Sequence, residues 1–406
     1  MAKKKSQKEK AKSASNKVLR FAHPFYTDVP IDERSKVPGV GKRLTDYIQT
    51  NLLPIPAPQR DPTMALAEVI GQAGSDAITA AGSIIFHATG DTGELAGNSQ
   101  QMVADAMTLD YDITHPETSP AFFYHLGDVD YYDNTDKGYH AQFYEPYAKY
   151  PGKIVAIPGN HDGEIFKYDG TSTGQTKTLQ EFMANFCQPI AGVPTAAGTI
   201  YREMVSQPSV YWLLQCPFVD IIGLYSNIAE NPGYISAPSI GTAQKDWLTQ
   251  TLTTIAKARK KGTRNALIIA THHPPFSQGS HSSSTQMLAD IDDSCTTAGI
   301  MPDAVLSGHS HNMQRYTRYV TFGGTDMQIP YFVCGCGGRT VTSVVPATGV
   351  RNGDNTYDKA ISAYGYLRIT VNAQALTIEF MEVSANQTQL FDKVTVNLAT
   401  STMVGQ

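Results

Sequence analysis

Oxygen and imidazole donors follow five apolar segments of the sequence, each of which has the character of a buried strand. Such side chains can ligate metal ions or transfer protons, but they are costly to bury unless they pair or bind a cation. Ligand sites of open α/β sheets lie at the carboxyl ends of the strands, so we expect these donors to meet in one crevice. Mixed carboxylate, amide and imidazole donors suit divalent and trivalent first-row cations better than a thiolate zinc site does. The donors are Asp91, Asp128, Asn160, His272, His309 and His311.

The segment around Asp128 shows this pattern in detail. Residues 121–126 are apolar and predict a buried strand, and Gly127 allows a sharp turn directly after it. A carboxylate at this point has two oxygens and could bridge two cations, and the phenol of Tyr131 could turn to the same place. Taken alone, the pattern is explained as well by a solvated turn carboxylate. The metal interpretation depends on all five segments together.

Strands and helices alternate from residue 83 onward, which predicts parallel βαβ units. After about residue 310 the expected helices stop and alternating strands follow. We therefore predict an α/β fold, a four-layer α/β/β/α sandwich of two mixed sheets packed face to face with flanking helices. Strands are expected at 84–88, 121–126, 154–157, 219–224, 266–270, 304–307, 329–333, 364–371, 376–383 and 391–398. Helices are expected at 61–80, 98–108, 142–149 and 244–257.

Composition and charge separate the chain into a body and a tail. The 406 residues are 41% hydrophobic and 17% charged, as in a globular protein. Residues 1–20 carry a net charge of +7 in a chain whose total is −5, which leaves −12 on the remainder. Such a tail could touch nucleic acid or an anionic membrane, but a solvated, disordered leader is the preferred interpretation. We divide the chain into this tail, an arm and helix at 21–80, and a main domain at 81–400.

Targeting signals and cysteine content indicate the cellular compartment in which the protein is expected. We find no secretory signal after the Lys-rich start and no apolar run of about 18 residues that could span a membrane. Five cysteines at irregular spacing are interpreted as reduced, which suggests a cytoplasmic protein. Cys334 and Cys336 could form a soft metal site, although packing at a strand end is the preferred explanation.

The order of the motifs resembles the calcineurin-like metallophosphoesterases, and within them the purple acid phosphatases. Most metallophosphoesterases carry a histidine two residues after the first aspartate, where this chain has Gly93. Purple acid phosphatases lack that histidine and use a tyrosine after the second aspartate, where this chain has Tyr131. The motifs are Gly-Asp-x-Gly at 90–93, Gly-Asp-x-x-Tyr at 127–131, Gly-Asn-His-Asp at 159–162, His-x-Pro at 272–274 and Gly-His-x-His at 308–311.

The resemblance implies a centre of two metal ions. Asp128 would be shared by both ions, and His272 is preferred to His273 as a ligand because of its spacing from Pro274. The first ion, Fe(III), would be held by Asp91, Tyr131, His311 and Asp128. The second ion, Fe(II), Zn or Mn, would be held by Asp128, Asn160, His272 and His309.

The resemblance also implies the reaction. A metal-bound hydroxide would attack a phosphate monoester in line, on a phosphorylated small molecule or phosphoprotein. His161 would contact the phosphate with Asp162 orienting it, and His281 would be a further histidine on the substrate side. One alternative is a phosphodiesterase or nucleotide hydrolase of the same fold, and another is a non-catalytic scaffold. A nucleic-acid-binding module is supported by the basic tail alone.

Overall fold

The computed structural model describes residues 55–404 except for residues 95, 113, 168–170, 228–232, 239, 263 and 386. The basic tail expected at 1–20 and the first part of the expected arm lie outside these residues. Among the described helices, none is both long and apolar enough to cross a bilayer.

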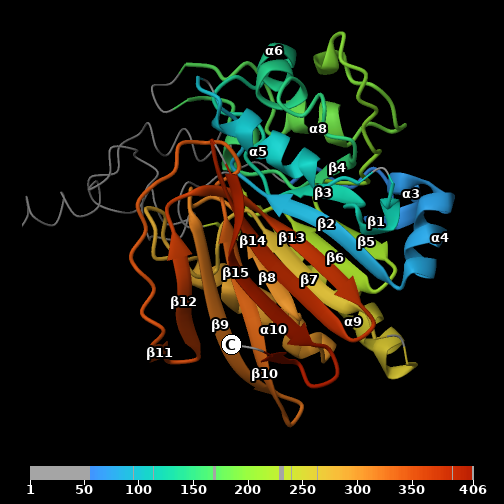
Figure 1. Ribbon diagram of the computed structural model, residues 1–406, viewed down its shortest axis with the longest axis vertical. Helices are drawn as coiled ribbons and strands as arrows, with labels where there is room; N and C mark the ends of the chain where they lie inside the picture. The colour runs from blue at the N-terminus through green and yellow to red at the C-terminus, as the bar shows by residue number, and fades with distance from the viewer. Residues whose placement is uncertain are drawn as a thin grey trace, which may run out of the picture.

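Two sheets form the centre of the molecule, and helices lie outside them (Figure 1). In spatial order, the first sheet contains β1 (Thr63–Ala65), β5 (Trp212–Cys216), β6 (Val219–Leu224), β7 (Ala266–Thr271), β8 (Ala304–Ser307), β10 (Thr325–Cys334), β9 (Met313–Phe322), β12 (Asn355–Ile361) and β11 (Arg351–Asn352). The second contains β16 (Thr402–Val404), β15 (Gln387–Asn397), β14 (Ala375–Ser384), β13 (Tyr364–Asn372), β2 (Ser83–Thr89), β3 (Phe122–His125) and β4 (Lys153–Ala156).

Each sheet has a parallel centre that directs its strand ends to one edge. Strands β2, β3 and β4 run parallel in one sheet, and β6, β7 and β8 run parallel in the other. Their residues are almost all buried, as expected for strands covered on both faces. The loops that carry the predicted donors therefore leave the sheets at the carboxyl ends of these strands.

Apolar packing holds the layers together and confirms the predicted α/β/β/α sandwich. Between the sheets, Phe86 and Phe122 stack with ring centroids 5.0 Å apart in a cluster that also contains Ile268 of the other sheet. Outside the second sheet, α5 (Ser99–Leu109) packs on β13 and β14. Outside the first sheet, α9 (Ala243–Lys260) and α10 (Thr285–Ala298) pack on β6 and β7.

Several other helical segments are short and lie in connections between strands. They are α6 (Asp136–Tyr139), the π-helix η3 (His140–Tyr144), α7 (Asn160–Gly163), α8 (Gln180–Phe186), and the 3-10 turns η2 (Pro116–Thr118) and η4 (Thr195–Ala197). The helix expected at 142–149 is therefore wrong in its bounds, because the chain is already helical at Asp136 and has only turn structure after Tyr144.

The helix expected at 61–80 is also wrong in its first half. The chain first forms β1, which pairs with β5, and then two helices, α3 (Leu66–Ile70) and α4 (Gln72–Ala81). Gly71 separates them with a φ of 82°, a conformation that interrupts a right-handed helix and that glycine adopts at low cost.

A buried ion pair joins the two sheets and gives a stability prediction. Arg315 on β9 donates to Asp392 on β15 at 2.6 Å and to Asp358 on β12 at 3.0 Å. Asp392→Ala should lower the free energy of unfolding by about 3 kcal/mol, because it leaves a buried guanidinium incompletely compensated. Urea unfolding followed by circular dichroism measures the change.

Lys393→Ala is the matched control, because Lys393 is the next residue but is 53% exposed in its pair with Glu379. Its effect should stay under about 1 kcal/mol. Equal destabilisation by the two variants would contradict a structural role for the ion pair between the sheets.

Candidate metal centre

Three of the predicted donors stand in the left-handed backbone region. The φ angles are 55° at Asp91, 55° at Asp128 and 67° at His309, and each residue comes directly after a glycine at the end of a strand. This conformation is uncommon for residues other than glycine and persists where the surrounding structure enforces it. Backbone strain is therefore concentrated where sequence analysis placed the donors.

The donors expected around the first ion lie together. The Tyr131 hydroxyl lies 3.1 Å from Asp91 Oδ1 and 3.2 Å from His311 Nε2. His311 Nε2 lies 3.4 Å from the same Asp91 oxygen. The other oxygen of Asp91 accepts the backbone N–H of His309 at 2.6 Å, which fixes the carboxylate.

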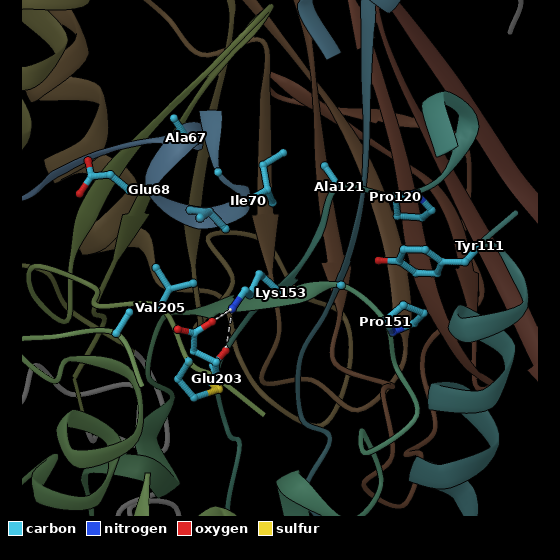
Figure 2. A pocket seen from close by; sticks show the side chains of 15 residues that line it. Ala67, Glu68, Ile70, Tyr111, Pro120, Ala121, Pro151, Lys153, Glu203 and Val205 are labelled. Atoms are coloured by element: carbon cyan, nitrogen blue, oxygen red, sulfur yellow. Dashed lines mark hydrogen bonds and ion pairs between the residues drawn. The ribbon is translucent and has the colours of Figure 1, made fainter. Parts of the chain in front are cut away.

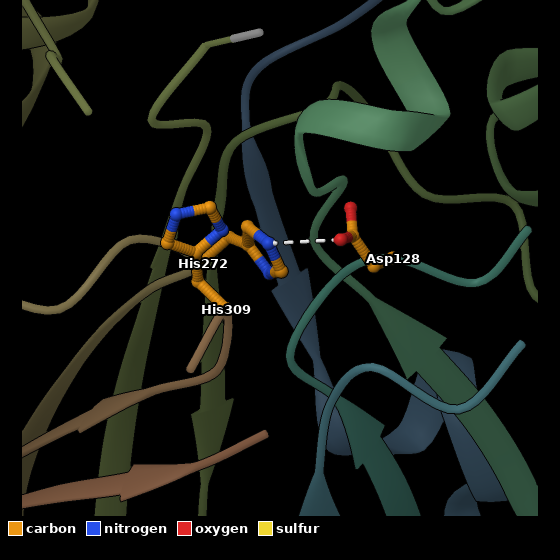
Figure 3. Close-up of side chains that lie close together, drawn as sticks. All are labelled: Asp128, His272 and His309. Atoms are coloured by element: carbon orange, nitrogen blue, oxygen red, sulfur yellow. Dashed lines mark ion pairs between the residues drawn. The ribbon is translucent and has the colours of Figure 1, made fainter. Parts of the chain in front are cut away.

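The donors expected around the second ion form an adjacent group. His272 Nε2 lies 3.1 Å from Asn160 Oδ1 and 3.3 Å from Asp128 Oδ2. One donor atom from each of Asp128, His272 and His309 lies within 4.8 Å of the others, and Figure 3 shows these three side chains close together. His272 Nε2 is also 4.0 Å from Asp91 Oδ1, so the two groups are continuous.

The hydrogen bonding of this cluster fits bound cations. His272 Nδ1 donates to the Leu126 carbonyl at 2.9 Å, so the neutral ring has its lone pair on Nε2, facing the oxygens of Asp128 and Asn160. Acceptors that face acceptors in a buried site are unfavourable unless a proton or a metal cation lies between them. Among the residues that the structure describes, the buried Asn160 Nδ2 atom has no hydrogen-bond partner, which leaves this donor for an acceptor that enters the site.

The pKa shifts of His272 and His309 also fit a metal site. Burial lowers the pKa of His272, but the Asp128 and Asp91 carboxylates outweigh it and raise the pKa to about 9, so a proton compensates the charge when no metal does. Burial, reinforced by neighbouring histidines, lowers the pKa of His309 and leaves its imidazole neutral, as a metal ligand must be. The donor set and its geometry therefore fit a pair of metal ions.

Gly93 leaves room for the ring of Tyr131. A Cβ atom at residue 93 would lie 2.9 Å from Cδ2 of Tyr131 and 2.8 Å from the Val129 carbonyl oxygen. Those separations are too short for carbon, so the Tyr131 ring occupies the space that a side chain at position 93 would need. Burial, followed by the charges of Asp128 and Asp91, raises the pKa of Tyr131 well above its usual value.

His161 stands beside this cluster, and its partner differs from the expected one. Its ring Nδ1 lies 3.0 Å from Glu164 Oε2, and its backbone N–H donates to Asp128 Oδ1 at 2.9 Å. Burial lowers the pKa of His161, but Glu164 and Asp128 outweigh burial and raise it well above the ordinary value. Glu164 was missed in the sequence, although its spacing of three residues from His161 could have indicated the pair.

Asp162 organises backbone rather than the His161 ring, which corrects the role expected for it. Its carboxylate accepts N–H groups from Gly159 at 2.7 Å, Asp128 at 2.9 Å and Val129 at 3.1 Å. It thereby ties the loop after β4 to the loop after β3, and it positions Asp128 directly.

Two further histidines lie against the cluster. The half-buried ring of His281 has its centroid 4.2 Å from that of His309 and 5.7 Å from that of His311, so it borders both donor groups. The ring of His273 is also 4.2 Å from His309, and its Nδ1 lies 2.8 Å from Ser226 Oγ. His273 thus packs behind the centre.

The two other candidate features lie elsewhere. Cys334 and Cys336 are buried between the sheets with their sulfurs 3.9 Å apart, in keeping with packing. A cavity of about 590 Å³ opens at the start of β3 and β4, the ends opposite the donors, where Lys153 and Glu203 pair at 2.8 Å (Figure 2). None of the predicted site residues lines it.

Solved structures resemble this fold. The purple acid phosphatase PPD1 from yellow lupin (Lupinus luteus) seeds superposes with a TM-score of 0.53 at 14% identity, over 84% of this chain and 55% of that one. The chain thus spans about half the length of the lupin protein. GAP50, described as the anchor in the inner membrane complex of Plasmodium, gives 0.52 at 12% identity, over 78% of this chain and 89% of that one. At such identities the likeness concerns the fold alone.

Sequence comparison identifies the family. No curated protein matches the sequence. The pattern of the calcineurin-like phosphoesterases matches residues 86–313, which is more than half of the chain and contains all of the predicted metal donors. The chain therefore belongs to the calcineurin-like phosphoesterase family.

Proposed function

We propose that this protein is a phosphatase of the purple acid phosphatase type that hydrolyses phosphate monoesters with two metal ions. The observation that supports this most directly is the position of the Tyr131 hydroxyl, 3.1 Å from Asp91 and 3.2 Å from His311. A buried phenol that points at a carboxylate and an imidazole is placed to ligate a cation as phenolate.

The donor types suggest which ions would bind. Carboxylate and phenolate oxygens around the first position favour a hard cation, for which we propose Fe(III). Carboxylate, amide and imidazole donors around the second suit Fe(II), Zn or Mn. When bound, two such ions neutralise phosphoryl oxygens and lower the pKa of water. The ligands would be Asp91, Tyr131, His311 and Asp128 for the first ion, and Asp128, Asn160, His272 and His309 for the second.

Residues of the chain itself would bind and orient the substrate. Protonated His161 would donate to an oxygen of the phosphate, and Glu164 would hold that ring in its charged form and fixed orientation. Asp162 would keep Asp128 in place through the backbone. His281, at the edge of both donor groups, is placed to contact the leaving-group oxygen.

Replacing Tyr131 tests the ligand that defines the proposed subtype. Iron-loaded protein should show a visible charge-transfer band, and Tyr131→Phe should abolish it because no other phenolate is proposed to bind the iron. Tyr144→Phe is the control, since Tyr144 is also a buried phenol but donates to Asn185. A band that persists unchanged in Tyr131→Phe would refute the ligand role.

Metal removal tests the two-ion centre through stability. Saturation at about 100 times the dissociation constant should stabilise the folded protein by about 2.7 kcal/mol per ion, and chelation should reverse this. His272→Ala should lose about one ion per chain by elemental analysis and part of the stabilisation. The exposed His115→Ala should keep both. Equal metal content in the two variants would exclude His272 as a ligand.

Substrate comparison separates the proposed activity from its alternatives. We expect metal-loaded protein to hydrolyse p-nitrophenyl phosphate with a higher kcat/KM than bis(p-nitrophenyl) phosphate. Preference for the diester would indicate a phosphodiesterase instead. Hydrolysis of neither ester by protein that contains both ions would support a non-catalytic scaffold.

A further inference from the structure

Arg339 stands at the rim of the metal centre on a loop that is fixed to it. The loop follows β10, and the backbone N–H of Arg339 donates to the Asp91 carbonyl at 2.9 Å. Gly337 donates to the Gly90 carbonyl at 3.0 Å. A Cβ atom at Gly338 would lie 2.2 Å from the Thr92 carbonyl oxygen, so the two loops pack backbone against backbone. The position of Arg339 is therefore tied to that of the first donor group.

The guanidinium of Arg339 lies over aromatic rings and has no anionic partner in the described part of the chain. Its Cζ atom is 4.5 Å from the centroid of the Tyr131 ring and 5.5 Å from that of Tyr132. Five N–H donors of a guanidinium need partners, and here the described residues supply no carboxylate or hydrogen bond to them. Arg202 differs in that its guanidinium donates to backbone carbonyls. Other arginines differ in that each pairs with a carboxylate, namely Arg259, Arg264, Arg315, Arg318 and Arg368.

The backbone of Tyr132, beside Arg339, has an unusual conformation. Its φ is 67°, which is a true outlier for a bulky aromatic residue and marks a conformation that the surroundings enforce. In this conformation its ring lies 4.9 Å from the ring of His161 and within 5.5 Å of the Arg339 guanidinium carbon. A strained backbone thus holds an aromatic ring beside both the His161 ring and the Arg339 guanidinium.

We infer that Arg339, supported by Tyr132, forms a subsite for a second anionic group on the leaving group of the substrate. This inference rests on the proposed phosphomonoesterase function. In the proposed function the scissile phosphate would be held by the two ions and His161, so Arg339 would remain for another anion. A guanidinium presents a planar fork that matches carboxylate and phosphate. The favoured substrates are phosphomonoesters that carry a carboxylate or second phosphate near the ester bond.

The subsite would also reduce the electrostatic repulsion between the acidic protein and an anionic substrate. The part of the chain after residue 20 carries a net charge of −12, which would repel a substrate with three or more negative charges. An unpaired arginine at the rim, shielded on one side by aromatic rings, offsets that repulsion for substrates that can reach it.

The test compares 3-phosphoglycerate with glycerol 3-phosphate, which differ in a carboxylate that replaces a hydroxymethyl group. We expect wild-type protein to prefer 3-phosphoglycerate in kcat/KM, and Arg339→Gln to reduce that preference about 10- to 100-fold, mainly through KM. Calorimetric Kd values for the two corresponding phosphonates, which cannot be hydrolysed, should show the same loss of preference. Arg351→Gln is the matched control, because Arg351 stacks on Tyr319 at 4.3 Å on strand β11.

Binding of the phosphonates and hydrolysis of the esters test the Arg339 subsite and the phosphatase activity separately. Phosphonate preference that Arg339→Gln removes, in a protein that hydrolyses neither ester, would keep the subsite and refute the phosphatase. Hydrolysis of both esters with no preference in wild type would keep the phosphatase and overturn the subsite. Equal loss on both substrates in Arg339→Gln, or the same loss in Arg351→Gln, would also overturn it.

Discussion

Lone pairs that converge in a buried space are the constraint on which the rest of this structure depends. Asp91, Asp128 and Asn160 direct oxygens at the single Nε2 atom of His272, at separations of 3.1 to 4.0 Å. Such an arrangement is unfavourable in a dry interior unless a cation lies within it, and the raised pKa of His272 shows the cost being met by a proton. The fold must hold these oxygen and nitrogen donor atoms close together although they repel one another.

Backbone hydrogen bonds between the loops supply that restraint. Asp91 donates to the Gly127 carbonyl at 2.9 Å, and Gly308 donates to the His272 carbonyl at the same distance. Asp162 adds charge-assisted bonds across two loops, and such bonds are stronger than those between neutral groups. Loops with these ties cannot separate to relieve repulsion, so the donors stay in place for a cation.

Sequence reasoning located the donors because parallel strands share an edge. The strands before Asp91, Asp128 and His272 could be recognised as apolar runs, and their parallel order brings their ends together. Helix α10 was not predicted, since its buried stripe of Met287, Ile291 and Cys295 is interrupted by buried polar residues. The helix break at Gly71 was missed because an isolated glycine does not always end a helix.

Some roles could not be predicted from sequence, because they depend on the path of the chain in space. Arg339 lies far in sequence from Tyr131, and only the packing of the loop after β10 on Asp91 brings them together. Whether Asp162 or Glu164 meets the His161 ring depends on the direction in which α7 begins. Both carboxylates follow His161 closely in the sequence, but in the folded chain Asp162 accepts backbone N–H groups and Glu164 pairs with the His161 ring.

The contact between Gly93 and Tyr131 restricts the routes by which this chain can evolve. A side chain introduced at residue 93 meets the Tyr131 ring and the Val129 carbonyl, so a histidine cannot be added while the tyrosine loop keeps its course. Removing Tyr131 first would leave one position of the proposed ligand set empty. Neither single replacement passes through a well-formed intermediate, and exchange between the two ligand sets therefore requires coupled changes at both loops.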